Sequence, residues 1–248
     1  MTRPCSCYSR YRFDPAPAKV VLQRLLAAAL VVGWGAASAG ELRTEGGNDG
    51  GTVTGSIRLH RATVQTDGPK HDRDVVVFLD PVGAADQPLS EGKATMDQRG
   101  LVFVPHVLAV QKGTTVTFLN SDSDQHNVYF LNDNTGETLD IGTWGPNVSV
   151  DHRFEEAGVV ITLCKLHLEM SAYIVVVESP WFSIVQIDDS TSTGSFSIQG
   201  VPPGEYELTA WHKKLKQKGG AARITVTRGE KTETEVVITK ARYASTSD

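Results

Sequence analysis

The chain has 248 residues, of which 40% are hydrophobic, and its formal net charge is −5 at pH 7. Residues 1–39 carry five basic residues and one acidic residue, so without them 19 Lys and Arg face 28 Asp and Glu, a net charge of −9. This balance argues against a nucleic-acid partner, because neutralising phosphates requires a basic surface.

The N-terminal segment has the pattern of a secretory signal peptide. Basic residues precede an apolar run at 25–32, and Ala37-Ser38-Ala39 supplies the small residues of a cleavage site. We therefore expect residues 1–39 to be removed and the mature protein to be periplasmic. The apolar run falls short of the roughly 20 residues that span a membrane, so we expect no membrane anchor.

A single cysteine is expected to remain in the exported chain. Of the three cysteines, Cys5 and Cys7 lie in the segment expected to be removed, and Cys164 remains. A single thiol cannot form an intramolecular disulfide. In a secreted protein it is therefore a reactive thiol, an intermolecular link or a metal ligand.

The mature chain reads as short, alternating, β-branched segments between turn residues, which predicts an all-β protein. We expect thirteen strands: Thr52–Leu59, Asp74–Leu79, Leu101–Val110, Thr114–Asn120, Asn127–Phe130, Val148–Phe154, Val159–Leu163, Ala172–Glu178, Phe182–Ile187, Ser195–Ile198, Glu205–His212, Arg223–Thr227 and Thr232–Thr239. Thirteen strands exceed the roughly seven of one small sandwich, so we expect two sandwiches.

Two distant segments each carry a different part of one sequence pattern. The first begins with Gly51-Thr-Val-Thr-Gly55, and the second contains Phe196 followed by Pro202-Pro-Gly-Glu-Tyr206. Both resemble the carboxypeptidase regulatory-like (transthyretin-like) sandwich. The resemblance predicts that residues 50–90 and 180–240 form one sandwich, with residues 91–179 inserted as a second. The alternative is three consecutive pieces.

The middle segment contains residues that suit a metal site. His126 follows a predicted strand, and Cys164, His167 and Met170 follow 38 residues later in a Cys-x-x-His-x-x-Met loop. Two imidazoles, a thiolate and a weak axial thioether are the ligands of electron-transfer copper sites, and soft sulfur favours copper. The alternative for Met170 is a core methionine.

The same segment resembles the cupredoxins, with a ligand-loop spacing similar to that of amicyanin. The family's lead-in is matched by Phe103-Val-Pro105 and by the run from Val110 to Asn120. The resemblance implies a Greek-key sandwich, a copper ligand set of His126, Cys164, His167 and Met170, and a hydrogen-bonding role for Asn127 between the two ligand loops. The whole mature chain resembles bacterial methylamine utilisation proteins.

The ligand loop departs from the cupredoxin pattern at two positions. Cupredoxins usually have an aromatic residue before the cysteine and a proline before the second histidine, where this chain has Leu163 and Leu166. These departures concern the reduction potential and the colour of the copper more than the identity of the metal.

We interpret the protein as a non-enzymatic periplasmic electron carrier whose partner is a redox protein such as a cytochrome or a periplasmic dehydrogenase. The alternatives are a copper chaperone or store, and a carbohydrate-type binding module with a structural copper domain. A copper oxidase or nitrite reductase would need further ligands such as a His-x-His pair, which the sequence does not contain.

Three further histidines are expected to have structural roles. His106 alternates with Val104 and Leu108 and is expected in the core. His152 stands between two charged residues and is expected to be solvated, and His212 is expected to pack within the flanking sandwich.

Overall fold

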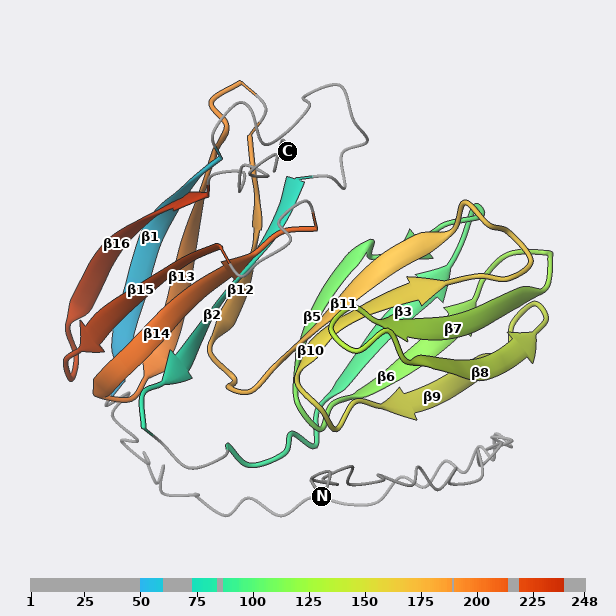
Figure 1. Cartoon of the computed structure of the whole chain (residues 1–248), viewed down its shortest axis with the longest axis horizontal. Helices are drawn as coiled ribbons and strands as arrows, with labels where there is room; N and C mark the ends of the chain where they lie inside the picture. The colour runs from blue at the N-terminus through green and yellow to red at the C-terminus, as the bar shows by residue number, and fades with distance from the viewer. Residues whose placement is uncertain (1–49, 60–72, 84–86, 189, 214–218, 239–248) are drawn as a thin grey trace, which may run out of the picture. The chain divides into compact units, whose positions relative to one another are not determined.

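The structure is a computed structural model that describes residues 50–59, 73–83, 87–188, 190–213 and 219–238. The predicted signal peptide, residues 1–39, lies outside these ranges. Within them the chain forms sixteen β-strands and no α-helix (Figure 1), which confirms the all-β prediction. In the part of the chain that the structure describes, no helix is long and apolar enough to span a bilayer.

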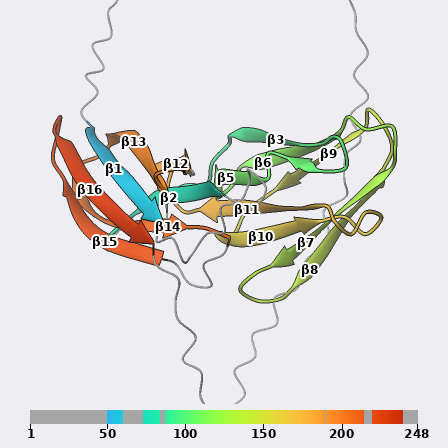
Figure 2. The ribbon, with the colours of Figure 1, turned by 90° about the horizontal axis from the view of Figure 1, so that it is seen from above.

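Residues 93–177 fold into two facing sheets. One sheet has the strand order β5-β11-β10-β7-β8 and the other has the order β4-β3-β6-β9. Figure 2 shows β3, β6 and β9 in one layer and β7, β8 and β10 in the other. The strands are β3 (Lys93–Gln98), β4 (Phe103–Val104), β5 (Val107–Gln111), β6 (Thr115–Asn120), β7 (His126–Asn132), β8 (Thr138–Trp144), β9 (Ser149–Arg153), β10 (Gly158–Leu163) and β11 (Ser171–Val177).

The core of this sandwich follows from alternation along its strands. In β6, Val116 and Phe118 are fully buried while Thr115 and Thr117, which alternate with them, are partly exposed, because successive side chains of a strand point to opposite faces. Phe118 packs against Phe130 of β7 with ring centroids 5.5 Å apart. Cys164 and Met170 belong to the same buried cluster, so this core extends to the predicted metal ligands.

The strands before and after this segment share two further sheets. Their orders are β13-β1-β16 and β12-β2-β14-β15. The N-terminal strand β1 pairs with β13 and β16, and β2 pairs with β12 and β14. The strands are β1 (Gly51–Leu59), β2 (Asp74–Pro81), β12 (Phe182–Gln186), β13 (Thr193–Val201), β14 (Gly204–Trp211), β15 (Gly219–Val226) and β16 (Lys231–Ile238).

The glycine pattern at the start of β1 has a packing reason. Gly55 is the register partner of Phe196 in β13. A Cβ atom at Gly55 would lie 2.6 Å from Cζ of Phe196, which is closer than packed atoms approach. Glycine at this position therefore lets the aromatic ring lie over the strand and join the core of the flanking sandwich.

The structure corrects the strand prediction around Pro105. The segment Leu101–Val110 was expected to be one strand, but it forms β4 and β5, which belong to different sheets. Pro105 lies between them, and because proline has no N–H to donate to a ladder, it interrupts the strand.

Two strands of the sandwich were not predicted. Strand β3 lies before the first segment with clear alternation, and β8 is a sheet edge whose first three residues are exposed. An edge strand with little buried surface lacks the alternating apolar pattern on which strand prediction rests. The pairing of β8 with β7 therefore became visible only in the structure.

We predict that residues 91–179 fold and bind copper as a separate fragment, because their core consists of residues from within that range. The fragment should carry threonine in place of Val107, Val175 and Val177, which are buried in the whole chain but point away from that core. Cooperative thermal unfolding and copper uptake equal to that of the full chain are expected. An unfolded fragment that binds no copper would contradict these domain boundaries.

Candidate metal centre

The predicted ligands lie at the ends of three neighbouring strands. His126 is the first residue of β7, Cys164 follows the end of β10, and Met170 precedes the start of β11. Strand β10 pairs with both β7 and β11, with Leu163 opposite Tyr129 and Ser171. The ladder therefore holds the ligand loop at both ends and places it beside His126.

The structure brings three of the four predicted ligands together. Nδ1 of His126 lies 3.1 Å from Nδ1 of His167, and Sγ of Cys164 lies 3.9 Å from the same His167 atom. The three ligand atoms all lie within 4.8 Å of one another. Nitrogen and thiolate ligands bind a transition metal at about 2.0–2.3 Å, so one ion fits among these atoms.

Burial distinguishes the two histidines of the cluster. His126 is fully buried and Cys164 is 2% exposed, whereas His167 is partly exposed. The cluster is therefore closed to solvent on the side of His126 and Cys164. A thiolate in this position is protected from oxidants and available to a soft metal ion.

Met170 closes the ligand loop through its backbone. Its N–H donates to the carbonyl of His167 at 3.0 Å, and its carbonyl accepts from the N–H of Cys164 at 3.3 Å. The side chain is 1% exposed and belongs to the same apolar cluster as Cys164. This burial is consistent with both an axial ligand and a core methionine, so the axial role of Met170 stays a prediction.

Asn127 links the two loops that carry the ligands. Its N–H donates to Sγ of Cys164 at 3.4 Å, and its side-chain Oδ1 accepts from the N–H of Lys165 at 3.4 Å. Its Nδ2 donates to Oδ1 of Asp140 and to the carbonyl of Gly142, both at 2.9 Å. A hydrogen bond to the sulfur disperses the charge of a thiolate and so stabilises it.

Asp140 forms a second connection to the ligand loop. Its Oδ2 pairs with Nζ of Lys165 at 2.5 Å, and the Lys165 ammonium holds the pKa of the Asp140 carboxyl below its ordinary value. Both side chains are partly solvated, so this pair adds little to stability. It does orient Asn127, because Asp140 binds Lys165 and Asn127 at the same time.

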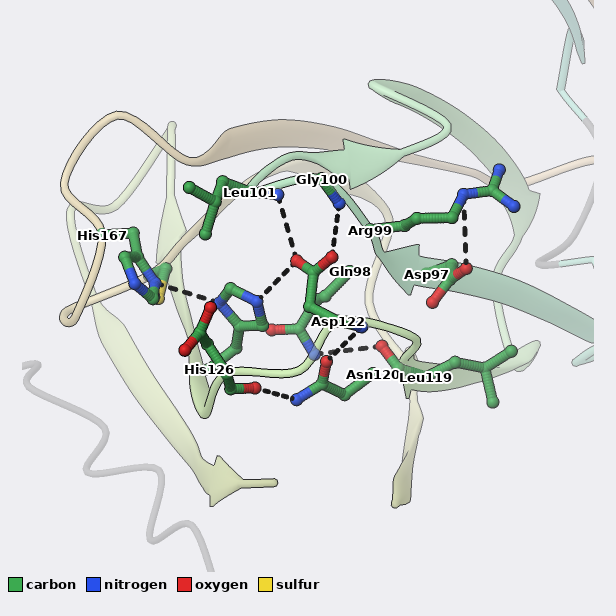
Figure 3. Close-up of polar contacts among 12 residues, drawn as sticks. Asp97, Gln98, Arg99, Gly100, Leu101, Leu119, Asn120, Asp122, His126 and His167 are labelled. Atoms are coloured by element: carbon green, nitrogen blue, oxygen red, sulfur yellow. Dashed lines mark hydrogen bonds and ion pairs between the residues drawn. The ribbon is translucent and has the colours of Figure 1, made fainter. Parts of the chain in front are cut away.

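Asp122 binds the outer nitrogen of His126 and was not identified from the sequence. Its Oδ2 lies 2.8 Å from Nε2 of His126 (Figure 3). Burial raises the pKa of the Asp122 carboxyl, but the backbone N–H groups of Leu101 and Gly100 and the His126 ring outweigh this and hold the pKa below its ordinary value. The i, i+4 spacing of Asp122 and His126 brings side chains together in a helix, but here a loop leads into β7, so the sequence gives no signal for this pair.

Two predictions about other histidines are wrong. His106 is half-buried rather than in the core, with its ring against Tyr173 and its Nε2 3.3 Å from Nζ of Lys213, because the strand breaks at Pro105 and the alternation does not continue. His152 is not solvated but packs against Phe130 and Phe154, and burial lowers its pKa. His212 is fully buried, as expected of a packing residue.

Residues 90–177 match the family of copper binding proteins of the plastocyanin/azurin type. Over this segment the chain is similar to the cupredoxins. Its cofactor is copper, which fits the soft and nitrogenous donors of His126, Cys164 and His167. Residues 185–234 match the second domain of polysaccharide lyase family 4. A comparison with curated proteins gives no match.

Solved structures similar to the chain include three copper proteins. A copper-containing nitrite reductase from Thermus scotoductus SA-01 is 25% identical over 40% of this chain and 26% of its own, with a TM-score of 0.34. A reduced amicyanin variant is 22% identical over 40% of this chain and 98% of its own, with a TM-score of 0.32. A purple cupredoxin from Nitrosopumilus maritimus is 26% identical over 34% of this chain and 98% of its own, with a TM-score of 0.30. The chain thus spans about a quarter of the nitrite reductase.

Replacement of the thiolate should remove the characteristic spectrum of the cupredoxin domain. In Cys164→Ser we expect loss of the thiolate-to-copper charge-transfer band after addition of Cu(II), because a serine hydroxyl is not ionised at neutral pH. His152→Phe is the matched control, since it changes an imidazole of the same sandwich outside the cluster, and it should keep the band. An unchanged visible spectrum in Cys164→Ser would exclude the thiolate as a ligand.

Replacement of the methionine should have a milder effect. In Met170→Leu we expect copper to remain bound and the reduction potential to rise, because a weak axial ligand tunes the potential more than it holds the ion. The potential is measured by redox titration and the copper content by elemental analysis. Complete loss of copper, or an unchanged potential, would contradict the axial role of Met170.

Proposed function

We propose that the protein is a periplasmic electron carrier in which one type 1 copper ion cycles between Cu(I) and Cu(II). The bound copper supplies the one-electron redox chemistry. The observation that carries the proposal is the fixation of the ligands by the β-ladder, since Cys164 and Met170 directly adjoin β10 and β11. A site that changes its geometry little between oxidation states exchanges electrons quickly.

The hydrogen bonds of the ligand loop support this rigidity. Cys164 and Met170 pair across the base of the loop, and the N–H of Lys165 donates to Oδ1 of Asn127. His126 is held from outside by Asp122. His126, Cys164 and His167 thus each come from a segment whose backbone or side chain is held by at least one further contact.

His167 and the apolar residues near it are proposed as the docking side for a redox partner. Leu166 and Leu168 flank His167 and are 52% and 85% exposed, and Leu101 is 39% exposed. Figure 3 shows Leu101 on the His167 side of the Asp122 carboxylate. A small apolar surface suits the brief encounters of electron-transfer proteins, which bury less than about 1,200 Å².

The proposed partner is a soluble redox protein such as a cytochrome or a periplasmic dehydrogenase. The periplasmic location rests on the signal-peptide pattern of residues 1–39, and the methylamine utilisation context rests on the resemblance described above.

The aromatic residues of the flanking sandwich favour a structural role for it over sugar binding. Trp181 packs on the core of the sandwich and donates its Nε1–H to the carbonyl of Gly200 at 3.2 Å. Trp211 is 7% exposed. A sugar platform needs exposed aromatic faces, whereas Trp211 is buried and Trp181 is partly buried against the core.

Copper delivery is the second candidate function, and copper retention distinguishes the two. We expect the loaded protein to keep its copper through repeated reduction and reoxidation in the presence of a Cu(I) chelator, because His126 and Cys164 are buried and the ligand loop is held by strands at both ends. We also expect rapid electron exchange with a soluble cytochrome in stopped-flow measurements. Ready transfer of Cu(I) to the chelator together with slow electron exchange would favour delivery.

The proposed docking side can be tested by comparing the electron-exchange rates of two leucine variants. Leu168→Lys should slow electron exchange with the cytochrome by roughly tenfold or more, because burying an unpaired charge in an apolar contact costs at least ~1–2 kcal/mol. Leu139→Lys is the control, since Leu139 is also exposed and lies on β8 far from Trp144, the register partner of His126. Equal rates in the two variants would exclude the proposed docking side.

A further inference from the structure

The two ring nitrogens of His126 face different partners. Nδ1 lies 3.1 Å from Nδ1 of His167 in the ligand cluster, and Nε2 lies 2.8 Å from Oδ2 of Asp122. The ring is fully buried and the Asp122 side chain is 14% exposed. The carboxylate is therefore placed on the side of the ring opposite to the copper cluster.

The contacts of Asp122 determine which atom carries the shared hydrogen. Its Oδ1 accepts from the N–H of Gly100 at 2.5 Å, and its Oδ2 accepts from the N–H of Leu101 at 3.0 Å. An ionised carboxylate only accepts hydrogen bonds, so Nε2 of His126 is the donor. The lone pair of a neutral imidazole then lies on Nδ1, the atom that faces the cluster.

The turn that holds Asp122 has an unusual backbone. Gly100 and Leu101 have φ values of 68° and 59°, and Leu101 is one of three non-glycine residues in the described ranges with a positive φ. This conformation is uncommon for leucine. Here it places two successive N–H groups around one carboxylate, as in the concave anion sites that backbone amides form.

The carboxylate is also fixed from its own loop. The N–H of Asp122 donates to Oδ1 of Asn120 at 3.0 Å, and Nδ2 of Asn120 donates to the carbonyls of Asp124 and Trp144. Trp144 is the register partner of His126. The acceptor and the ring that donates to it are thus held in one connected set of hydrogen bonds (Figure 3).

We propose that Asp122 is a positioning residue that fixes the tautomer and orientation of His126 and lowers the reduction potential of the copper. A carboxylate that accepts from the outer nitrogen of a metal-bound imidazole makes the ligand more basic. A more basic ligand with a nearby negative charge stabilises Cu(II) more than Cu(I). The effect on the potential rests on the electron-transfer function proposed above.

The test compares Asp122→Asn with Asp124→Asn. Both variants remove one negative charge from the same loop, but Asp124 is exposed and only its backbone carbonyl contributes to the contacts described above. In Asp122→Asn we expect a loss of Cu(II) affinity of about 10- to 100-fold, with a smaller loss for Cu(I). Each tenfold decrease in the ratio of Cu(II) affinity to Cu(I) affinity raises the reduction potential by about 59 mV. Asp124→Asn should leave the potential close to that of the unaltered protein.

NMR of the His126 ring supplies a second measurement, the signal of its Nε2–H proton. This signal depends on the hydrogen bond to Asp122 and not only on the stability of the fold. In the diamagnetic Cu(I) form, the Nε2–H proton of His126 should be visible, strongly shifted and protected from exchange in the unaltered protein and in Asp124→Asn. It should move or disappear in Asp122→Asn. Absence of this proton from the unaltered protein would overturn the proposal even if Asp122→Asn fails to fold.

The two proposals fail in different ways. Slow electron exchange and loss of Cu(I) from the unaltered protein would refute the carrier function and leave the assignment of the Nε2–H proton intact. Equal reduction potentials in Asp122→Asn and Asp124→Asn, with rapid exchange in the unaltered protein, would refute the role of Asp122 alone.

Discussion

The antiparallel pairing of β10 with β7 is the interaction on which the metal centre depends. It places the loop after β10 beside the start of β7, so Cys164 lies within hydrogen-bonding distance of the N–H of Asn127. The pairing of β10 with β11 then returns the chain to the same end of the sheet. Ligands from two distant parts of the sequence therefore meet at backbone positions that the ladder fixes.

Charge around the site is arranged asymmetrically. Asp140 is neutralised by Lys165, whereas the negative charge of Asp122 is met by backbone N–H groups, which carry only partial charges, and by the His126 ring. Among the described residues, Asp122 therefore forms no ion pair with a lysine or arginine. Such an arrangement favours the more positive state of a bound metal ion.

The loop that carries Cys164, His167 and Met170 could be recognised in the sequence because its spacing is local, whereas the contacts around His126 could not. Cys164, His167 and Met170 lie within one loop, and soft donors at short intervals are a strong signal for a metal. The support of His126 instead depends on Gly100 and Leu101, more than twenty residues before Asp122. Their N–H groups have no side-chain signature, so only the fold shows that they converge.

The two imidazoles of the cluster have different surroundings, and this difference gives a direction to the proposed electron path. His126 is fully buried and tied to an anion whose turn is itself hydrogen-bonded, so its ring is part of the interior. His167 is partly exposed between two leucines that face solvent. Leu101 joins the two sides, because its N–H holds Asp122 while its side chain is exposed. The same turn therefore supports the buried ligand and contributes to the surface at which the proposed partner would receive the electron.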